Sequence, residues 1–259
     1  MSIRKITLAS VLTASTLAFA LSFAPLQQAQ ASEKGHQPHW GYEGEYGPKH
    51  WGAMSKENAV CSQGKTQSPI DITGASHEPL PDIGFAYKPS KLNILNNGHT
   101  VQVNYDEGSS ITLDNVKYNL LQFHFHDPSE HTVGGKSFGM EVHLVHKNAK
   151  GELAVVGLLI NEGKENAVLA ETWKNMPAKA DEKKALSSKI NAQDLLPSDH
   201  SYYRYTGSLT TPPCSEGVNW LVFTTPIEMS KAQIAAFKKI INKNARPVQP
   251  INARKVRVK

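Results

Sequence analysis

Alternating apolar and polar residues, in short runs separated by Gly, Pro and Asn, dominate the chain from residue 39 onward. A period of two is typical of strands that bury one face, so we expect a strand-rich protein. The clearest predicted strands span residues 100–105, 110–113, 116–126, 139–146, 153–160 and 218–223. Helical spacing is sparse and favours a helix only at 165–174 and at 230–241, where Ser230 is a suitable N-cap. The Asn-Asn-Gly sequence at 96–98 predicts a turn between two early strands.

The chain shows no internal repeat and no linker, so we expect a single mostly-β domain. Of its 259 residues, 39% are hydrophobic and 20% are charged, which excludes disordered, collagenous and multi-span membrane proteins. The formal net charge of +5 is spread along the chain, apart from a weak basic cluster at 254–259. Because no aromatic residues or binding motif accompany that cluster, we expect no nucleic-acid partner.

Residues 1–31 predict a signal peptide. Arg4 and Lys5 form a positively charged start, residues 6–24 are uncharged and rich in Ala, Leu and Ser, and Ala29-Gln30-Ala31 is a small-x-small cleavage pattern. Cleavage leaves a domain of residues 32–259 that we expect to be periplasmic or secreted, without membrane attachment. The alternative is a retained N-terminal anchor, which the short apolar stretch, interrupted by Thr and Ser, disfavours.

The two cysteines, Cys61 and Cys214, lie far apart in the sequence. An exported protein meets oxidising conditions, so we expect them to form a disulfide. Two free buried thiols are the alternative. A thiolate metal site is disfavoured because two isolated cysteines lack the paired spacing of such sites.

The predicted strand 116–126 has an unusual polar face in its second half. Side chains alternate between the two faces of a strand, which sets Leu121, Phe123 and Phe125 on one face and Gln122, His124 and His126 on the other. A buried core strand would carry Val or Ile where the two imidazoles stand. The His-x-His spacing therefore indicates a function for this face.

The next predicted strand, 139–146, adds a third histidine. Alternation places Glu141, His143 and Val145 on one of its faces. If the two strands pair as antiparallel neighbours, His143 comes beside the other two imidazoles. Three neutral imidazoles can then bind one Zn²⁺ ion.

Three protein ligands leave one coordination position open, as in catalytic rather than structural zinc sites. Gln122 and Glu141 each stand two residues before a histidine ligand, where they can accept the N–H of a neighbouring imidazole. The alternative is a set of hydrogen-bonded structural histidines, which is the role we expect for His131 and His146.

The chain resembles the α-class carbonic anhydrases in several motifs that occur in the same order. These are His39-Trp40-Gly41-Tyr42, Gln67-Ser68-Pro69-Ile70-Asp71-Ile72, Asn96-Asn97-Gly98-His99, Gln122-Phe123-His124-Phe125-His126, Ser129-Glu130-His131-Thr132-Val133, Glu141-Val142-His143-Leu144-Val145-His146 and Gly207-Ser208-Leu209-Thr210-Thr211-Pro212-Pro213. The resemblance extends from about Trp40 to Arg254. It implies a large twisted central β-sheet with a few short peripheral helices, and reversible hydration of carbon dioxide to bicarbonate and a proton.

The resemblance also implies a mechanism. Zinc held by His124, His126 and His143 lowers the pKa of its bound water to about 7, as is established for this family, and the resulting hydroxide attacks CO2. Thr210 accepts a hydrogen bond from that hydroxide and donates its own to Glu130, which orients the nucleophile.

Further roles follow from the resemblance alone. Three acceptors hold the zinc ligands: Gln122 for His124, Glu141 for His143 and the backbone carbonyl of Asn244 for His126. An apolar pocket for CO2 consists of Val145, Val155, Leu209, Val218 and Trp220, with Thr211 near the exit of bicarbonate. His99 is the proton shuttle, and Tyr42, Asn97 and Gln102 form a polar wall that orders water.

Other readings remain open at this point. Some members of this superfamily have lost a zinc ligand and serve as binding modules, although all three histidines, Thr210 and Glu130 are present here. A zinc hydrolase with another substrate and a periplasmic zinc buffer are further alternatives.

Asp127 departs from the family, since vertebrate members usually have Trp there. We expect a monomer or a homodimer.

Overall fold

The computed structural model describes residues 39–259, which belong to one compact unit. The predicted signal peptide, residues 1–31, lies outside the described residues. Within the described range, no helix is long and apolar enough to span a membrane.

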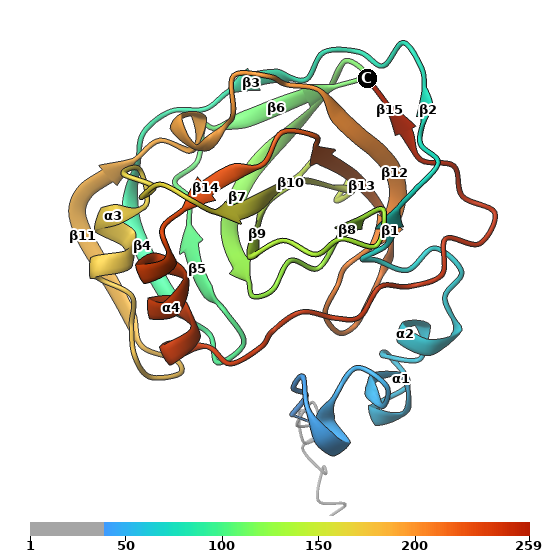
Figure 1. The fold of residues 1–259 in the computed structure, drawn as a ribbon, viewed down its shortest axis with the longest axis horizontal. Helices are drawn as coiled ribbons and strands as arrows, with labels where there is room; N and C mark the ends of the chain where they lie inside the picture. The colour runs from blue at the N-terminus through green and yellow to red at the C-terminus, as the bar shows by residue number, and fades with distance from the viewer. Residues whose placement is uncertain (1–38) are drawn as a thin grey trace, which may run out of the picture. The chain divides into compact units, whose positions relative to one another are not determined.

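A large mixed β-sheet forms the centre of the molecule (Figure 1). In the described part of the chain it has thirteen strands, ordered β11-β4-β5-β7-β9-β10-β13-β12-β15-β2 along the main path, with β14 on β10 and with β6 pairing both β3 and β7. Their bounds are β2 Ser76–His77, β3 Gly84–Ala86, β4 Ser90–Asn96, β5 Val101–Asn104, β6 Ser110–Leu113, β7 Val116–His126, β9 Met140–Lys147, β10 Leu153–Glu162, β11 Lys183–Ile190, β12 Tyr202–Ser208, β13 Glu216–Phe223, β14 Ile227–Met229 and β15 Arg257–Val258. A separate parallel pair consists of β1 Asp71–Ile72 and β8 Thr132–Val133.

The six predicted strands are confirmed as β5, β6, β7, β9, β10 and β13, with bounds that differ by at most two residues. The predicted turn at 96–98 lies between β4 and β5. The sequence pattern does not predict β11 or β12. Strand β11 reads KKALSSKI, a Lys- and Ser-rich sequence that alternates exposed and half-buried residues at the end of the sheet. Tertiary pairing, rather than intrinsic strand preference, determines its conformation.

The helices are short and peripheral. They are η1 Gly44–Tyr46, α1 Trp51–Met54, α2 Val60–Gln63, α3 Ala170–Lys174, η2 Ala192–Leu195 and α4 Lys231–Ile240. Ser230 caps α4 as predicted, in a capping box with Gln233. The prediction of a helix over 165–174 is wrong in its first half, because α3 begins only at Ala170. There the Asn166 amide bonds the backbone of Leu169 and Glu228, and these contacts hold a turn.

The predicted facing of Leu121 is wrong. A β-bulge interrupts the β7–β9 pairing between Leu120 and Gln122. The extra residue shifts the alternation, so that Leu120 is buried and Leu121 is 39% exposed. Beyond the bulge the alternation is regular, and Phe123 and Phe125 are fully buried as expected.

The apolar face of β7 packs on the peripheral helices. The Phe125 ring meets Trp173 of α3 at a centroid distance of 4.7 Å and Phe237 of α4 at 6.3 Å. Figure 1 shows α3 and α4 on one side of the molecule, near β4, β5 and β11. This packing buries the apolar face of β7 and holds the strand in place. The polar side chains of β7 therefore lie on its opposite face.

Two features tie distant parts of the chain together. The predicted disulfide between Cys61 and Cys214 is present and joins segments 153 residues apart. Strand β15 lies between β12, with which it is antiparallel, and β2, with which it is parallel.

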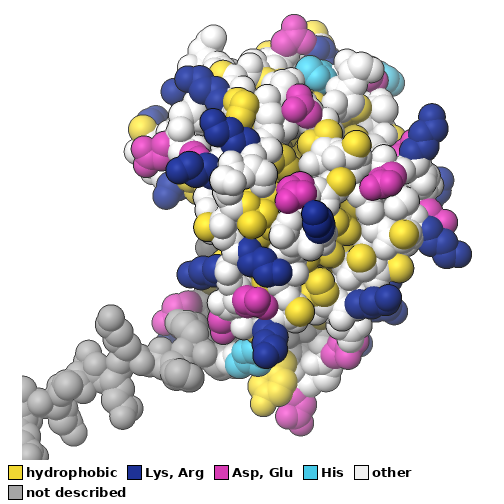
Figure 2. All heavy atoms as spheres, turned by 90° about the vertical axis from the view of Figure 1, so that its left-hand side faces the viewer, with side chains coloured by type: hydrophobic (Ala, Val, Ile, Leu, Met, Phe, Trp, Pro, Cys, Tyr) yellow, Lys and Arg dark blue, Asp and Glu magenta, His cyan; other side chains and the backbone are white. Residues whose placement is uncertain are grey.

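On the face seen in Figure 2, basic and acidic side chains are interspersed with apolar ones, and neither sign of charge gathers into a continuous patch.

Candidate active site

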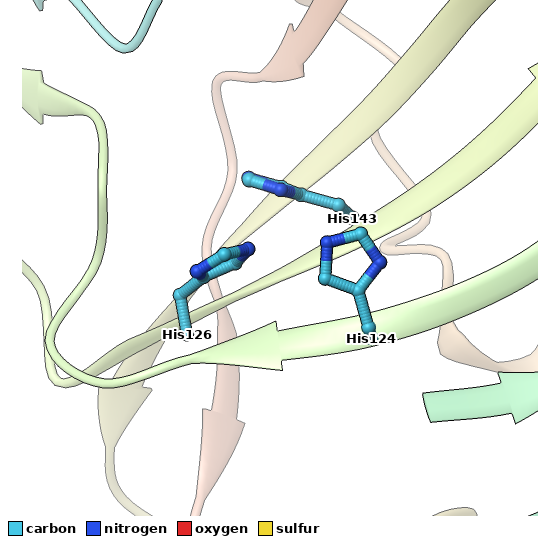
Figure 3. A group of neighbouring side chains, drawn as sticks. All are labelled: His124, His126 and His143. Carbon is cyan, nitrogen blue, oxygen red and sulfur yellow. The ribbon is translucent and has the colours of Figure 1, made fainter. Parts of the chain in front are cut away.

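Three histidines from two adjacent strands converge on the face of β7 opposite its apolar contacts (Figure 3). The strands β7 and β9 pair antiparallel with His124 directly opposite His143, while His126 faces Glu141. One ligand atom from each of the three imidazoles lies within 4.8 Å of the other two. The ring centroids are 4.5–5.3 Å apart.

An acceptor fixes one ring nitrogen of each histidine on β7. His124 donates its Nδ1–H to Gln122 Oε1 at 2.9 Å, and His126 donates its Nδ1–H to the backbone carbonyl of Asn244 at 2.8 Å. These bonds set the tautomers, because a neutral imidazole carries one proton and one lone pair. The Nε2 lone pair of each ring is therefore free for a metal.

The third histidine has the opposite tautomer. His143 Nε2–H donates to Glu141 Oε1 at 2.8 Å, which leaves its Nδ1 lone pair free. Although burial acts to raise the pKa of Glu141, its pairing with His131 and His143 outweighs burial and holds that pKa well below its usual value. Glu141 is thus an ionised acceptor for His143.

The free nitrogen atoms of these three histidines are suited to binding a metal ion. Among the described residues, His126 Nε2 is buried without a hydrogen-bond partner, as is Glu130 Oε2 3.5 Å away. Burial lowers the pKa of His126 to about 4, and burial likewise lowers the pKa values of His124 and His143. Neutral imidazoles with free lone pairs are the form that binds Zn²⁺, and three of them are the ligand set of an open, catalytic zinc site.

Glu130 lies next to the histidines and is fully buried. Its Oε1 accepts the backbone N–H of Arg246 at 2.8 Å, and its Oε2 is 3.9 Å from His143 Nδ1. Burial raises the pKa of Glu130 to about 7, whereas His143, the Thr210 hydroxyl and the Arg246 N–H act in the opposite direction. The arrangement places the Thr210 hydroxyl beside a carboxyl group at the edge of the histidine site.

An apolar row continues the histidine face across three strands. Val145 of β9 pairs with Val155 of β10, which pairs with Trp220 of β13. Val145 lies two residues from His143 and so shares its face. The Trp220 ring is 4.8 Å from the His143 ring, and Val218 and Leu209 pack in the same cluster. The five residues predicted to line an apolar pocket thus form one cluster beside the histidines.

A cavity of 140 Å³ borders His124 and His126. Its lining combines the predicted wall with residues of β7 and its surroundings: Trp40, Tyr42, Asn97, His99, Thr100, Gln102, Gln122, His124, His126 and Thr211. His99 also lines a neighbouring pocket of 290 Å³ with His39 and Trp40. The structure therefore places His99 between the histidine cavity and an outer pocket.

The His99 ring stacks on Trp40 at a centroid distance of 3.7 Å and an interplanar angle of 8°. Burial and the nearby His39 lower its pKa, and Asp181 opposes them. Asn97 has a structural task within the wall, because its Oδ1 accepts the backbone N–H groups of His99 and Thr100 at 3.0 and 2.9 Å.

The other wall residues and the structural histidines have defined partners. Gln102 donates to Asn104 at 2.6 Å. Burial, followed by the charge of Glu130, raises the pKa of Tyr42 well above its usual value, so its hydroxyl stays protonated. His131 bonds Glu141 and the Tyr205 hydroxyl, and His146 bonds the Tyr87 hydroxyl at 2.8 Å.

The sequence analysis names the Asn244 carbonyl but misses three other contributions to the site. The backbone of Arg246 holds Glu130, the Thr100 hydroxyl bonds the Phe125 carbonyl at 2.6 Å, and the Asn244 side chain bonds three backbone groups around the histidines. These contacts join segments at least 25 residues apart. No local spacing signals them.

Comparison with known proteins places the chain in a family. The family model of eukaryotic-type carbonic anhydrases matches residues 46–259. A carbonic anhydrase of Pectobacterium carotovorum is 46% identical over 220 residues, which cover 83% of this chain and 89% of the relative. An α-carbonic anhydrase from Thermovibrio ammonificans, solved with the inhibitor sulfanilamide, is 47% identical with a TM-score of 0.83 and covers 84% of this chain and 98% of its own.

The chain belongs to the eukaryotic-type, or α-class, carbonic anhydrase family. The same fold also occurs in dioscorin, solved in complex with ascorbate, at 31% identity and a TM-score of 0.80 over 85% of this chain and 97% of the dioscorin chain. Family membership and fold agree with the resemblance seen in the sequence motifs.

Proposed function

We propose that this protein is a zinc-dependent enzyme that hydrates CO2 reversibly to bicarbonate and a proton. The observation that carries the proposal is the set of three neutral histidines, each with one nitrogen fixed by an acceptor and the other free toward a common point. His124, His126 and His143 would hold the ion. When bound, Zn²⁺ lowers the pKa of a coordinated water to about 7, as is established for carbonic anhydrases, and so supplies the nucleophile.

Thr210 and Glu130 orient the attacking oxygen. Glu130 has a buried carboxyl oxygen, Oε2, without a hydrogen-bond partner among the described residues, and the Thr210 hydroxyl beside it would donate a hydrogen bond to this group. Once Thr210 donates to Glu130, its hydroxyl oxygen presents only lone pairs to the cavity. It would therefore accept a hydrogen bond from the attacking oxygen and turn the reactive lone pair of that oxygen toward the substrate.

The row of apolar residues beside the histidines supports CO2 as the substrate. CO2 is small and carries no charge, so it needs an apolar pocket next to the histidines rather than a charged recognition group. Val145, Val155 and Trp220 supply that surface. Leu209 and Val218 would complete it, and Thr211, which lines the cavity beside His124 and His126, would lie near the exit of bicarbonate.

His99 transfers the product proton to buffer. It borders both the histidine cavity and the outer pocket, and the unperturbed pKa of an imidazole lies near neutrality. Tyr42, Asn97 and Gln102 line the intervening cavity and would order the water that carries the proton.

Export of the protein is part of the proposal. The disulfide fits an oxidising compartment such as the periplasm or the extracellular medium. A signal peptide at residues 1–31, followed by a domain of residues 32–259, would deliver it there. N-terminal sequencing of the secreted protein tests the cleavage site after Ala31.

A binding module is the second candidate, because the related dioscorin fold is known in complex with ascorbate. Stopped-flow CO2 hydration by the purified protein, paired with its zinc content, separates the two. We expect one zinc per chain, and loss and recovery of hydration on chelation and zinc addition. A zinc-loaded, folded protein without hydration activity would contradict the proposal.

A further inference from the structure

The side chain of Asn244 joins three segments of the chain at the metal site. Its Oδ1 accepts the backbone N–H of Asp127 at 2.8 Å, and its Nδ2 donates to the carbonyls of His99 at 3.0 Å and Phe125 at 2.8 Å. Asn244 is 1% exposed, and its bonds to Asp127 and Phe125 are buried, while the bond to His99 is partly buried. All three partners of the Asn244 amide are backbone groups. The position of this side chain therefore determines where the three backbone groups lie.

Two of these contacts concern the proposed chemistry directly. Phe125 is the residue between the metal ligands His124 and His126, and His99 is the residue that borders both cavities. A single amide nitrogen therefore connects the backbone of the ligand strand with the backbone of the His99 turn.

Thr100 makes the same connection from the other side. Its hydroxyl donates to the Phe125 carbonyl at 2.6 Å and accepts the Phe125 N–H at 3.2 Å. The Phe125 carbonyl thus accepts two hydrogen bonds, one from Asn244 and one from the residue that follows His99. Thr100 is also buried.

We propose that Asn244 and Thr100 form a positioning clamp, which fixes the distance between His99 and the metal ligands. The clamp acts on the backbone, so it fixes the point of attachment of the His99 ring, which itself stacks on Trp40. Proton transfer through ordered water depends on that distance, because small displacements of a transferring group are costly. The catalytic part of this inference rests on the proposed function, and the positional part does not.

Two substitutions test the clamp. Asn244→Asp keeps the acceptor for the Asp127 N–H but loses both donors, and it sets a carboxylate oxygen against two carbonyls. Thr100→Val removes one hydroxyl at nearly constant shape, so it remains informative if Asn244→Asp fails to fold. Asn148→Asp is the matched control, because Asn148 is a buried amide with three comparable hydrogen bonds at the β9–β10 turn.

The positional readout is the NMR spectrum of the zinc-loaded protein. Stacking on Trp40 shifts the His99 ring protons upfield, through the ring current of the indole. We expect these resonances to move toward unshifted values in Asn244→Asp and Thr100→Val, and to remain unchanged in Asn148→Asp. Wild-type resonances in both clamp variants would overturn the proposal, whatever the activity of the protein.

The catalytic readout is kcat for CO2 hydration in dilute buffer. We expect both clamp variants to lower it about fivefold, with recovery in concentrated imidazole, since misplacing a reacting group has effects up to about 10²-fold. The double variant His99→Ala/Asn244→Asp should be no slower than His99→Ala alone. Additive losses would show that Asn244 does not act through His99 and would overturn the clamp.

Discussion

Thr210 and His99 serve two separable steps of the proposed reaction. Thr210 lies beside the buried Glu130 and would orient the attack on CO2, whereas His99 lies at the outer end of the cavity. The ratio kcat/KM reports steps up to the first irreversible one, while kcat also includes the return of the proton to buffer.

We predict opposite kinetic signatures for the two residues. His99→Ala should lower kcat in dilute buffer roughly 10-fold or more, leave kcat/KM nearly unchanged and be rescued by imidazole. Thr210→Ala should lower kcat/KM about 100-fold without rescue, because orientation of the nucleophile is lost. Stopped-flow CO2 hydration measures both, with the exposed Thr206→Ala as control. If His99→Ala lowers kcat/KM as much as kcat, the proton leaves by another route.

His146 makes the stability of the fold depend on pH. It is fully buried, and burial lowers its pKa to about 4, from 6.5. Above pH 6.5 neither the folded nor the unfolded state binds a proton here. As the pH falls below 6.5, the unfolded chain takes up a proton that the folded chain refuses until about pH 4, so stability decreases over this window.

Between pH 6.5 and pH 5, His146 should cost the wild type about 2 kcal/mol of unfolding free energy. His146→Gln should lack this part of the pH dependence, although it is less stable at pH 7 through loss of the bond to Tyr87. Urea unfolding of both zinc-loaded proteins at the two pH values measures the difference. Equal losses in the two proteins would exclude His146 as the titrating group.

The strands that build the site illustrate what a sequence pattern can and cannot reveal. Two histidines two residues apart and a third on the following strand are a local signal, and they form one site if β7 and β9 pair as antiparallel neighbours. The bulge at Leu121 has no such signal, because it arises where one edge of β7 changes its partner from β6 to β5 while the other edge stays paired with β9. Asn244, Arg246 and Thr100 could not be found by local spacing, since each acts across distant segments.

Strand β9 contributes one proposed ligand, His143, so replacing this residue tests its role in metal binding directly. His143→Ala should leave two protein ligands, and we expect zinc affinity and CO2 hydration both to collapse. Metal analysis after dialysis against a chelator measures retention, with Lys147→Ala on the same strand as control. Stoichiometric zinc together with near-normal turnover would show that His143 is not a ligand.

At the scale of the whole molecule, the Cys61–Cys214 disulfide closes a loop of 153 residues. Cross-linking a loop of this size stabilises by about 5 kcal/mol in the chain-entropy estimate. Reduction should therefore lower the Tm by about 10 °C or more. Zinc should be retained, because the ligands lie on β7 and β9 rather than beside the cysteines.

Thermal unfolding with and without reductant, followed by metal analysis, tests this expectation. The double variant Cys61→Ser/Cys214→Ser serves as the control and should not respond to reductant. An unchanged Tm on verified reduction, or release of zinc from the reduced folded protein, would contradict it.

Strand β15 is two residues long, yet it pairs with Tyr203 and Arg204 of β12. Without it, these residues would present unpaired N–H and C=O groups, and such an open strand edge is a template for association with other chains. Loss of residues 256–259 would also remove the buried side chains of Val256 and Val258. The proposed metal ligands lie on β7 and β9, several strands away from β12 in the sheet order. Truncating or tagging this end of the chain should therefore promote aggregation before it disturbs the proposed metal site.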